Sequence, residues 1–170
     1  LIALATFTAT PVLADSVKDF YSGPGKNMQF VIRSTPGGGY DLLTRLLARH
    51  MGRHIPGNPN IKPVNMPGGG GIVAANYLYN VAPKDGSVIE ILSQGLVVTQ
   101  TLQLAKQLRV DLAKFNYIAN IIASNQILVA WKDSKVKSLE QAKRTQLTIG
   151  ATGAGSVSVQ LPALYNNVLG

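Results

Sequence analysis

The chain has 170 residues, of which 46% are hydrophobic and 14% charged, so it is long enough to bury a core and too apolar for intrinsic disorder. It contains no cysteine, which excludes disulfide scaffolds, cysteine-ligated metal sites and cysteine nucleophiles. Sixteen Lys and Arg against eight Asp and Glu give a net charge of +8, which favours anionic partners without specifying a fold.

The first fourteen residues have the character of a secretory signal peptide. Residues 1–14 carry no charge, and Val12-Leu13-Ala14 fits the pattern that precedes a cleavage point. The run is too short to span a bilayer, which takes about 20 apolar residues. We therefore expect a signal-peptide remnant at 1–14, cleavage after Ala14 and export to the periplasm; the alternative is a buried helix or strand.

After this leader, apolar runs and glycine-rich breaks alternate as in an α/β fold. The run MQFVIR at 28–33 is typical of a strand, and Leu43, Leu47 and Met51 recur at helical spacing after the next break. The elements expected in this half are strands at 28–33, 61–66 and 87–92, helices at 41–54 and 72–81, and a turn at 83–86. Because right-handed crossovers return each strand in the same direction, the alternation predicts a parallel sheet with helices on both faces.

The second half has less regular patterns. The elements expected there are a helix at 97–107, strands at 117–122, 126–131 and 146–150, a short helix capped by Ser138, and a helix from 157 with a kink at Pro162. The last strand, a glycine loop at 151–156 and the last helix repeat the earlier unit. We therefore expect a second lobe to begin near residue 122.

Two glycine loops, at 37–39 and 68–71, each separate a predicted strand from a predicted helix. In a parallel sheet such loops lie at the carboxyl edge, together with Ser93 and Gln94 after the third strand. The first N–H groups of each helix lack internal partners and carry the positive end of the helix dipole. Two such loops predict a socket of donors for an anion; the alternative is that the glycines serve only tight turns.

The candidate ligand-binding residues come from these loops, from the third glycine loop and from the segment between the lobes. They are Gly37, Gly38, Gly39, Tyr40, Asp41, Gly68, Gly69, Gly70, Gly71, Ser93, Gln94, Asn125, Thr152, Gly153, Gly155 and Ser156. Asp41 is expected mainly to cap its helix, and a cap is the alternative role of Ser156. Of the helical stripe Arg45, Arg49 and Arg53, only Arg45 is expected near enough to assist an anion.

Three motifs in a fixed order carry a resemblance to a known family. They are Pro36-Gly37-Gly38-Gly39-Tyr40-Asp41 followed by Arg45, then Asn65-Met66-Pro67-Gly68-Gly69-Gly70-Gly71, then Pro83-Lys84-Asp85-Gly86. Weaker matches lie at 111–115 and 152–156. The chain resembles the periplasmic substrate-binding receptors of tripartite tricarboxylate transporters, the Bug-type solute-binding proteins.

This resemblance implies a periplasmic-binding-protein-like (Venus flytrap) α/β receptor with a first lobe at 15–121 and the start of a second at 122–170. It implies capture of a small carboxylate for the membrane subunits of a tripartite transporter, by a protein that is monomeric when complete and has no catalysis and no cofactor. The first two loops are expected to hold one carboxylate, and the loop at 152–156 to contact the rest of the ligand. Family members are longer, so the resemblance also implies a fragment with an incomplete second lobe.

The sequence departs from the family at three places. Gly69 stands where Ala is common, Ser87-Val88 follows the Asp-Gly turn where Tyr-Thr is common, and the histidine often found after the third loop is absent. The last departure leaves the contacts to the far end of the ligand open.

Other classes of function have weaker support. The run 69–74 fits a loose G-x-G-x-x-A pattern with Glu90 near the end of the next strand, which makes a dinucleotide-binding oxidoreductase the enzyme alternative. His50 and His54 are spaced as a metal pair, but no carboxylate accompanies them in that turn. Nucleic-acid binding is not expected, since the cations are spread along the chain and only 6% of residues are aromatic.

Overall fold

The computed structural model describes residues 13–23, 26–123 and 125–169. The elements in chain order are α1 (Leu13–Ser22), β1 (Asn27–Ile32), α2 (Gly39–Met51), the 3-10 turn η1 (Gly52–His54), β2 (Asn60–Asn65), α3 (Ile72–Asn80), β3 (Val88–Glu90), α4 (Gly95–Thr101), the 3-10 turn η2 (Leu112–Lys114), α5 (Leu139–Ala142) and α6 (Val157–Leu169). The first strands and helices thus lie within a few residues of the ranges expected from the sequence.

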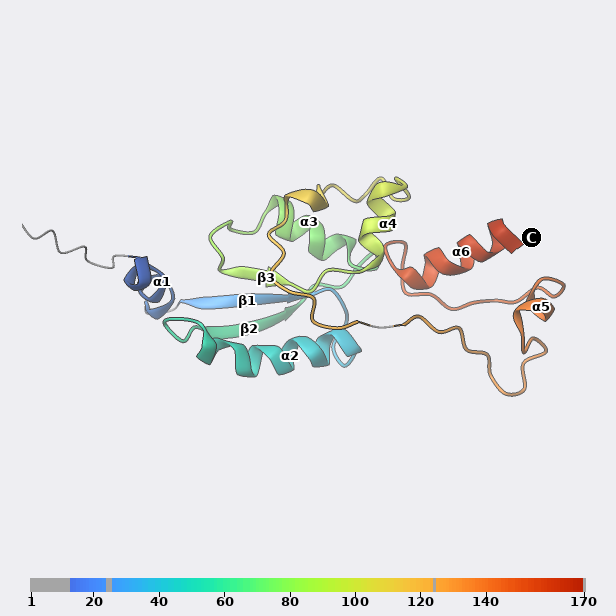
Figure 1. Ribbon diagram of the computed structural model, residues 1–170, viewed down its shortest axis with the longest axis horizontal. Coiled ribbons are helices and arrows are strands. Elements are labelled where there is room, and N and C mark those ends of the chain that lie inside the picture. Colours follow the sequence, from blue (N-terminus) through green and yellow to red (C-terminus); the bar gives the residue numbers. More distant parts are fainter. Residues whose placement is uncertain (1–12, 24–25, 124, 170) are drawn as a thin grey trace, which may run out of the picture.

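A three-stranded parallel sheet with the order β2-β1-β3 forms the centre of the molecule. The pairing runs from Asn27 opposite Asn60 to Ile32 opposite Asn65, and Val31 lies opposite Glu90. Helix α2 covers one face of this sheet, and α3 and α4 lie on the other (Figure 1). The prediction of an α/β fold with a parallel sheet and helices on both faces is confirmed.

Two apolar clusters, one on each side of the sheet, stabilise this arrangement. Met28, Phe30 and Ile61 are buried beside the apolar face of α2, while Ile72 and Leu96 are buried between α3, α4 and η2. Each fully buried aliphatic or aromatic side chain contributes about 1.5–3 kcal/mol relative to exposure. The clusters fix the strand ends, and therefore the loops, at one edge.

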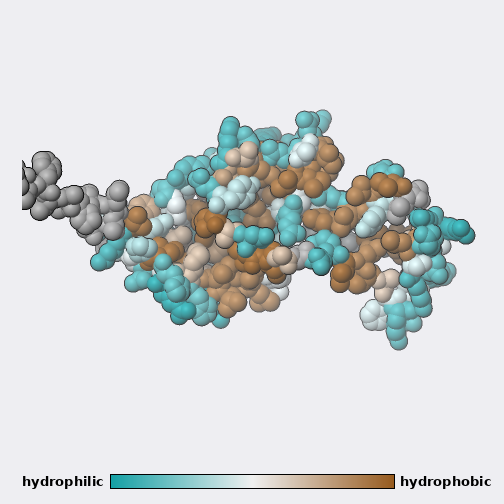
Figure 2. Space-filling view, viewed as in Figure 1, coloured by the Kyte–Doolittle hydropathy of each residue, from teal (hydrophilic) through white to brown (hydrophobic). Residues whose placement is uncertain are grey.

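The strands expected at 117–122, 126–131 and 146–150 do not form in the described part of the chain. Their patterns are apolar, yet Ile127, Val129 and Trp131 are 82%, 78% and 76% exposed. Apolar side chains accordingly gather at the surface of the C-terminal part of the molecule (Figure 2). A strand needs a neighbour for its N–H and C=O groups, and no described strand lies beside these segments.

The helix expected at 97–107 begins earlier and ends at Thr101. Gln103 has a positive φ of 52°, Gln103 N donates to Gln100 O, and Leu104 N donates to Thr99 O at 2.9 Å. This pair of bonds is the Schellman pattern, which satisfies the last carbonyls and stops the helix. The Ser138 cap is confirmed, since its hydroxyl accepts the Gln141 N–H at 3.2 Å.

The expected leader lies almost wholly on residues 1–12, outside the described residues. Its last two residues, Leu13 and Ala14, open α1. Among the described helices, none combines the length and the apolar character needed to cross a membrane.

Candidate functional site

Helices α2, α3 and α6 begin at the carboxyl edge of the sheet, where the strands end (Figure 1). Gly39 starts α2 after β1, Ile72 starts α3 after β2, and Val157 starts α6 after the third glycine loop. The first N–H groups of each helix have no acceptor inside the helix, and the helix dipole adds positive potential there. The predicted convergence of the loops is therefore present, and the edge is suited to an anion.

The first loop is held by Asp41, which is buried at the start of α2. Asp41 Oδ2 accepts the Gly37 N–H at 2.9 Å, and Oδ1 accepts from Arg45 Nε at 3.0 Å. Asn65 at the end of β2 donates to the same Oδ1 at 2.8 Å and also to Ser34 O at 2.9 Å. Asp41 thus binds the loop before the helix, and not the free N–H groups of the first turn as expected.

These donors also set the charge of Asp41. The hydrogen bond from Arg45, with those from the Gly37 N–H and Asn65, lowers the pKa of Asp41 to about 2. Arg45 in turn donates to Asn65 Oδ1 at 2.8 Å. Arg45, the cation expected to assist an anion, is therefore already paired with a carboxylate and an amide.

The second loop is built from close backbone contacts. Its four glycines, Gly68, Gly69, Gly70 and Gly71, all have positive φ, a region that side chains rarely adopt. A Cβ on Gly70 would lie 2.7 Å from Ser156 N, and a Cβ on Gly71 would lie 3.1 Å from Ser93 Cβ. Glycine is therefore required here by packing, whatever the loop binds.

The third glycine loop lies directly on the second. Gly155 N donates to Gly69 O at 2.9 Å, and Ser93 Oγ donates to Gly155 O at 3.2 Å. On α6, Gln160 Nε2 donates to Gly95 O at 2.9 Å and to Thr99 Oγ1 at 2.7 Å, which fixes the helix to α4. Gly153 and Ser156 belong to the same contact, since a Cβ on Gly153 would lie 2.7 Å from Gly70 N and one on Gly70 would lie 2.7 Å from Ser156 N.

The first loop, in contrast, faces open space. A Cβ built on Gly37 or Gly39 meets no atom within 4 Å, and one on Gly38 makes only ordinary contacts. The N–H groups of Gly39 and Tyr40 lie in the first turn of α2, where the helix offers no acceptor. A ligand can approach the backbone most closely at this loop.

Three candidate residues lie at the margin. Asn125 is exposed, and no hydrogen bond among the described residues joins it to the loops. Gln94 is exposed at the N-cap of α4. Thr152 is exposed and its N–H donates to Ser158 Oγ at 3.1 Å.

Two groups at this edge are absent from the sequence-based candidates for the carboxylate site. Arg33 follows β1 directly and donates from NH1 to Gly70 O at 3.3 Å. Both carboxylate oxygens of Glu90, at the end of β3, are buried without a hydrogen-bond partner among the described residues. Burial raises the pKa of Glu90 to about 8, against the attraction of Arg33. Both residues lie inside predicted strands, at 28–33 and 87–92, and a charged side chain near the end of an otherwise apolar run was the available signal.

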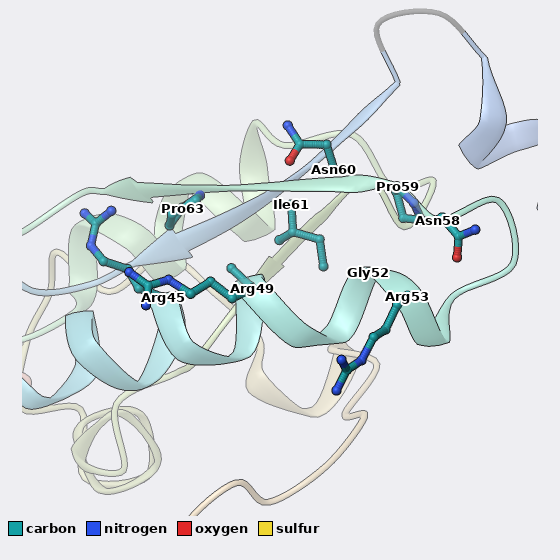
Figure 3. A pocket seen from close by; sticks show the side chains of 10 residues that line it. Arg45, Arg49, Gly52, Arg53, Asn58, Pro59, Asn60, Ile61 and Pro63 are labelled. Carbon is teal, nitrogen blue, oxygen red and sulfur yellow. The ribbon is translucent and has the colours of Figure 1, made fainter.

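Two cavities are lined by residues outside the three glycine loops. One, of about 400 Å³, lies between α2 and the edge strand β2 and is lined by Arg45, Arg49 and Arg53 together with Asn60 and Pro63 (Figure 3). The other, of about 550 Å³, lies between α6 and the exposed segments at 126–131 and 147–150. At the carboxyl edge of the sheet, the backbones of the second and third loops fill the space where these loops touch.

The topology does not support the dinucleotide alternative. In that motif the acidic residue ends the strand next to the one that carries the glycine loop. Here the loop at 69–71 follows β2, whereas Glu90 ends β3 on the far side of β1, with its oxygens buried. For the histidine pair, His54 Nε2 accepts from Arg53 Nε, and no group of three metal-binding side chains occurs in the described ranges.

Comparison with known proteins finds two relatives. The chain is 31% identical over 138 residues to the "UPF0065 protein in gbd 5'region" of Cupriavidus necator, and the matched residues make up 77% of this chain. It is 26% identical over 141 residues to the "UPF0065 protein in tcbD-tcbE intergenic region" of a Pseudomonas species, and the matched residues make up 78% of this chain. The chain is a relative of the UPF0065 proteins. UPF0065 denotes the Bug-type receptor family, so the predicted family resemblance is confirmed.

The match to the UPF0065 proteins covers only part of their length. The chain spans 40% of the length of each of these relatives. No family model matches the chain. No solved structure matches it either.

Proposed function

We propose that this UPF0065 relative is the periplasmic substrate-binding receptor of a tripartite transporter. It captures a small carboxylate-bearing metabolite and delivers it to membrane subunits, without catalysis and without a cofactor. Residues 15–121 supply the first lobe, and residues 122–170 begin the second.

One observation carries this proposal: the N-termini of α2, α3 and α6 meet at the carboxyl edge of the sheet, linked by the bonds from Gly155 to Gly69 and from Arg33 to Gly70. Backbone N–H groups at helix N-termini bind carboxylates because they combine free donors with positive potential. The relation to UPF0065 proteins supports the same class of function.

The ligand is placed at the first loop. Gly37 and Gly39 face open space, and Asp41 holds their backbone in position through the Gly37 N–H. In this proposal the second loop and the third loop, with Thr152 and Ser156, close over the rest of the ligand. Asn125 reaches the ligand only if the segment around it moves.

Thermal unfolding of the protein expressed from its complete reading frame tests the proposal. The panel contains succinate, citrate and benzoate, with NAD as the probe of the dinucleotide alternative. At a hundredfold excess over its dissociation constant, a bound acid stabilises the protein by about 2.7 kcal/mol. The proposal fails if no acid raises the Tm, and a shift with NAD alone supports the oxidoreductase reading.

Export is tested separately. Protein recovered from a periplasmic extract is expected to begin at Asp15, because cleavage is expected after Ala14. An N-terminus at Leu1 on the exported protein contradicts the expected cleavage.

A further inference from the structure

Arg33 lies between the first and second glycine loops. Its guanidinium carbon is 3.6 Å from the centre of the Tyr40 ring, and its NH1 donates to Gly70 O at 3.3 Å. Its stem passes Gly71, where a Cβ would lie 3.1 Å from Arg33 Cδ. The missing side chain of Gly71 and the flat ring of Tyr40 therefore fix the guanidinium at the edge where the loops meet.

The positive charge of Arg33 is not neutralised by a neighbouring carboxylate. In the described ranges the ion pairs join Arg45 to Asp41, Lys114 to Asp111 and Lys143 to Glu140, and none includes Arg33. Arg33 Nε is buried and has no hydrogen-bond partner there. A half-buried cation with an unused donor costs free energy until an anion approaches it.

Glu90 is the acidic residue that acts on Arg33, and its burial keeps it from serving as a counter-ion. The raised pKa of Glu90, about 8, leaves this carboxyl neutral at pH 7. Arg45, the other arginine near the loops, is already bound to Asp41 and Asn65. Of these two arginines, Arg33 is the one whose charge remains available.

We propose that Arg33 is the ionic contact for the ligand carboxylate and makes the site select acids over their uncharged analogues. This inference rests on the proposed function and adds a side chain to a site otherwise made of backbone donors. A guanidinium offers a planar pair of N–H groups that matches the two oxygens of a carboxylate. The Tyr40 ring holds that plane, so little side-chain entropy is lost on binding.

Isothermal titration of the full-length protein with succinate, citrate and benzoate, each beside its amide, tests this role. The wild type is expected to bind at least one acid in preference to its amide. Arg33→Gln is expected to weaken binding of that acid at least tenfold and to leave amide binding unchanged. Arg49→Gln removes the same charge from the exposed face of α2 and is the matched control, with acid affinity within twofold of wild type.

Arg33→Lys separates recognition from folding. It keeps the stem and the charge but not the planar pair of donors, so it is expected to fold as the wild type does and to bind the acid several-fold more weakly. If the wild type binds an acid and both Arg33 variants bind it within twofold, the inference is wrong and the proposed function stands. If the wild type binds none of the acids, the proposed function fails and this inference fails with it.

Discussion

The loop at 37–39 is held by side chains, whereas the loop at 68–71 is held by its own backbone and by the third loop. In the first, Asp41 binds the Gly37 N–H and is itself bound by Arg45 and Asn65. In the second, positive φ angles and contact with Gly155 leave no room for a Cβ. Similar glycine runs therefore have different structural roles: the first leaves open space beside its backbone, and the second packs against the third loop.

Replacing one glycine in each loop tests this difference with the largest expected effect. Gly70→Ala places a Cβ 2.7 Å from Ser156 N at a φ of 71°, so we expect a loss of about 2–4 kcal/mol in the free energy of unfolding. Gly39→Ala enters open space at the start of a helix and is expected to change stability by less than about 0.5 kcal/mol. Urea unfolding measures both. Equal losses of unfolding free energy in the two variants would contradict the difference between a tightly packed second loop and an open first loop.

Acid sensitivity tests the side-chain anchor of the first loop. Because Asp41 has a pKa of about 2 in the folded protein against 3.8 for a free side chain, its stabilising contribution is present above pH 3.8 and is lost as the pH falls toward 2. Asp41→Asn is expected to lower the Tm at pH 7 and to remove this part of the acid dependence. Unfolding curves at pH 7, 4 and 3 measure it; parallel losses in wild type and variant would count against the anchor.

The buried carboxyl of Glu90 predicts a pH dependence of stability opposite in sign to that of Asp41. Folded Glu90 keeps its proton up to about pH 8, whereas the unfolded chain releases it near 4.5. The unfolded state then binds fewer protons, so stability falls as the pH rises through this window, by at most about 1.4 kcal/mol per pH unit. Glu90→Gln is expected to flatten this slope in unfolding measurements between pH 5 and 8. An unchanged slope shows that another group titrates.

Removing the hydrogen bonds that fix α6 to α4 is expected to change the free energy of unfolding least. Gln160→Ala removes the bonds to Gly95 O and Thr99 Oγ1 and is expected to cost about 1 kcal/mol, with faster hydrogen exchange in α6. Asn167→Ala, which removes only a bond to Ala163 O within the same exposed helix, is the control. Equal exchange rates in the two variants mean that Gln160 does not fix α6.

The sheet could largely be predicted from the sequence, because β1 contains the apolar run FVI and β3 the run VI shortly after Gly86. The signal for β2 is weaker, since its residues are NIKPVN. Val31 and Ile32 are buried in the central strand β1, as their apolar pattern predicts. The run 126–131 has a similar pattern but no strand beside it in the described residues, and no local signal reports a missing neighbour.

The positions of the first two glycine loops followed from parallel topology, but the bonding of their residues did not. Asp41 binds backward to Gly37 and across to Asn65, a residue 24 positions away. Arg33 acquires its role from Tyr40, Gly70 and Gly71, which come together only in the folded chain. Such long-range contacts decide which arginine is paired and which is available.

The most direct test of a carboxylate site at the open first loop is chemical-shift mapping of the ¹⁵N-labelled full-length protein during titration with succinate, citrate and benzoate. We expect the shifts from at least one acid to concentrate on Gly37, Gly38, Gly39, Tyr40 and the side chain of Arg33. Shifts confined to the cavity between α2 and β2 that is lined by Arg49 and Arg53, or no shifts with any of the three acids, would contradict a carboxylate site at the first loop.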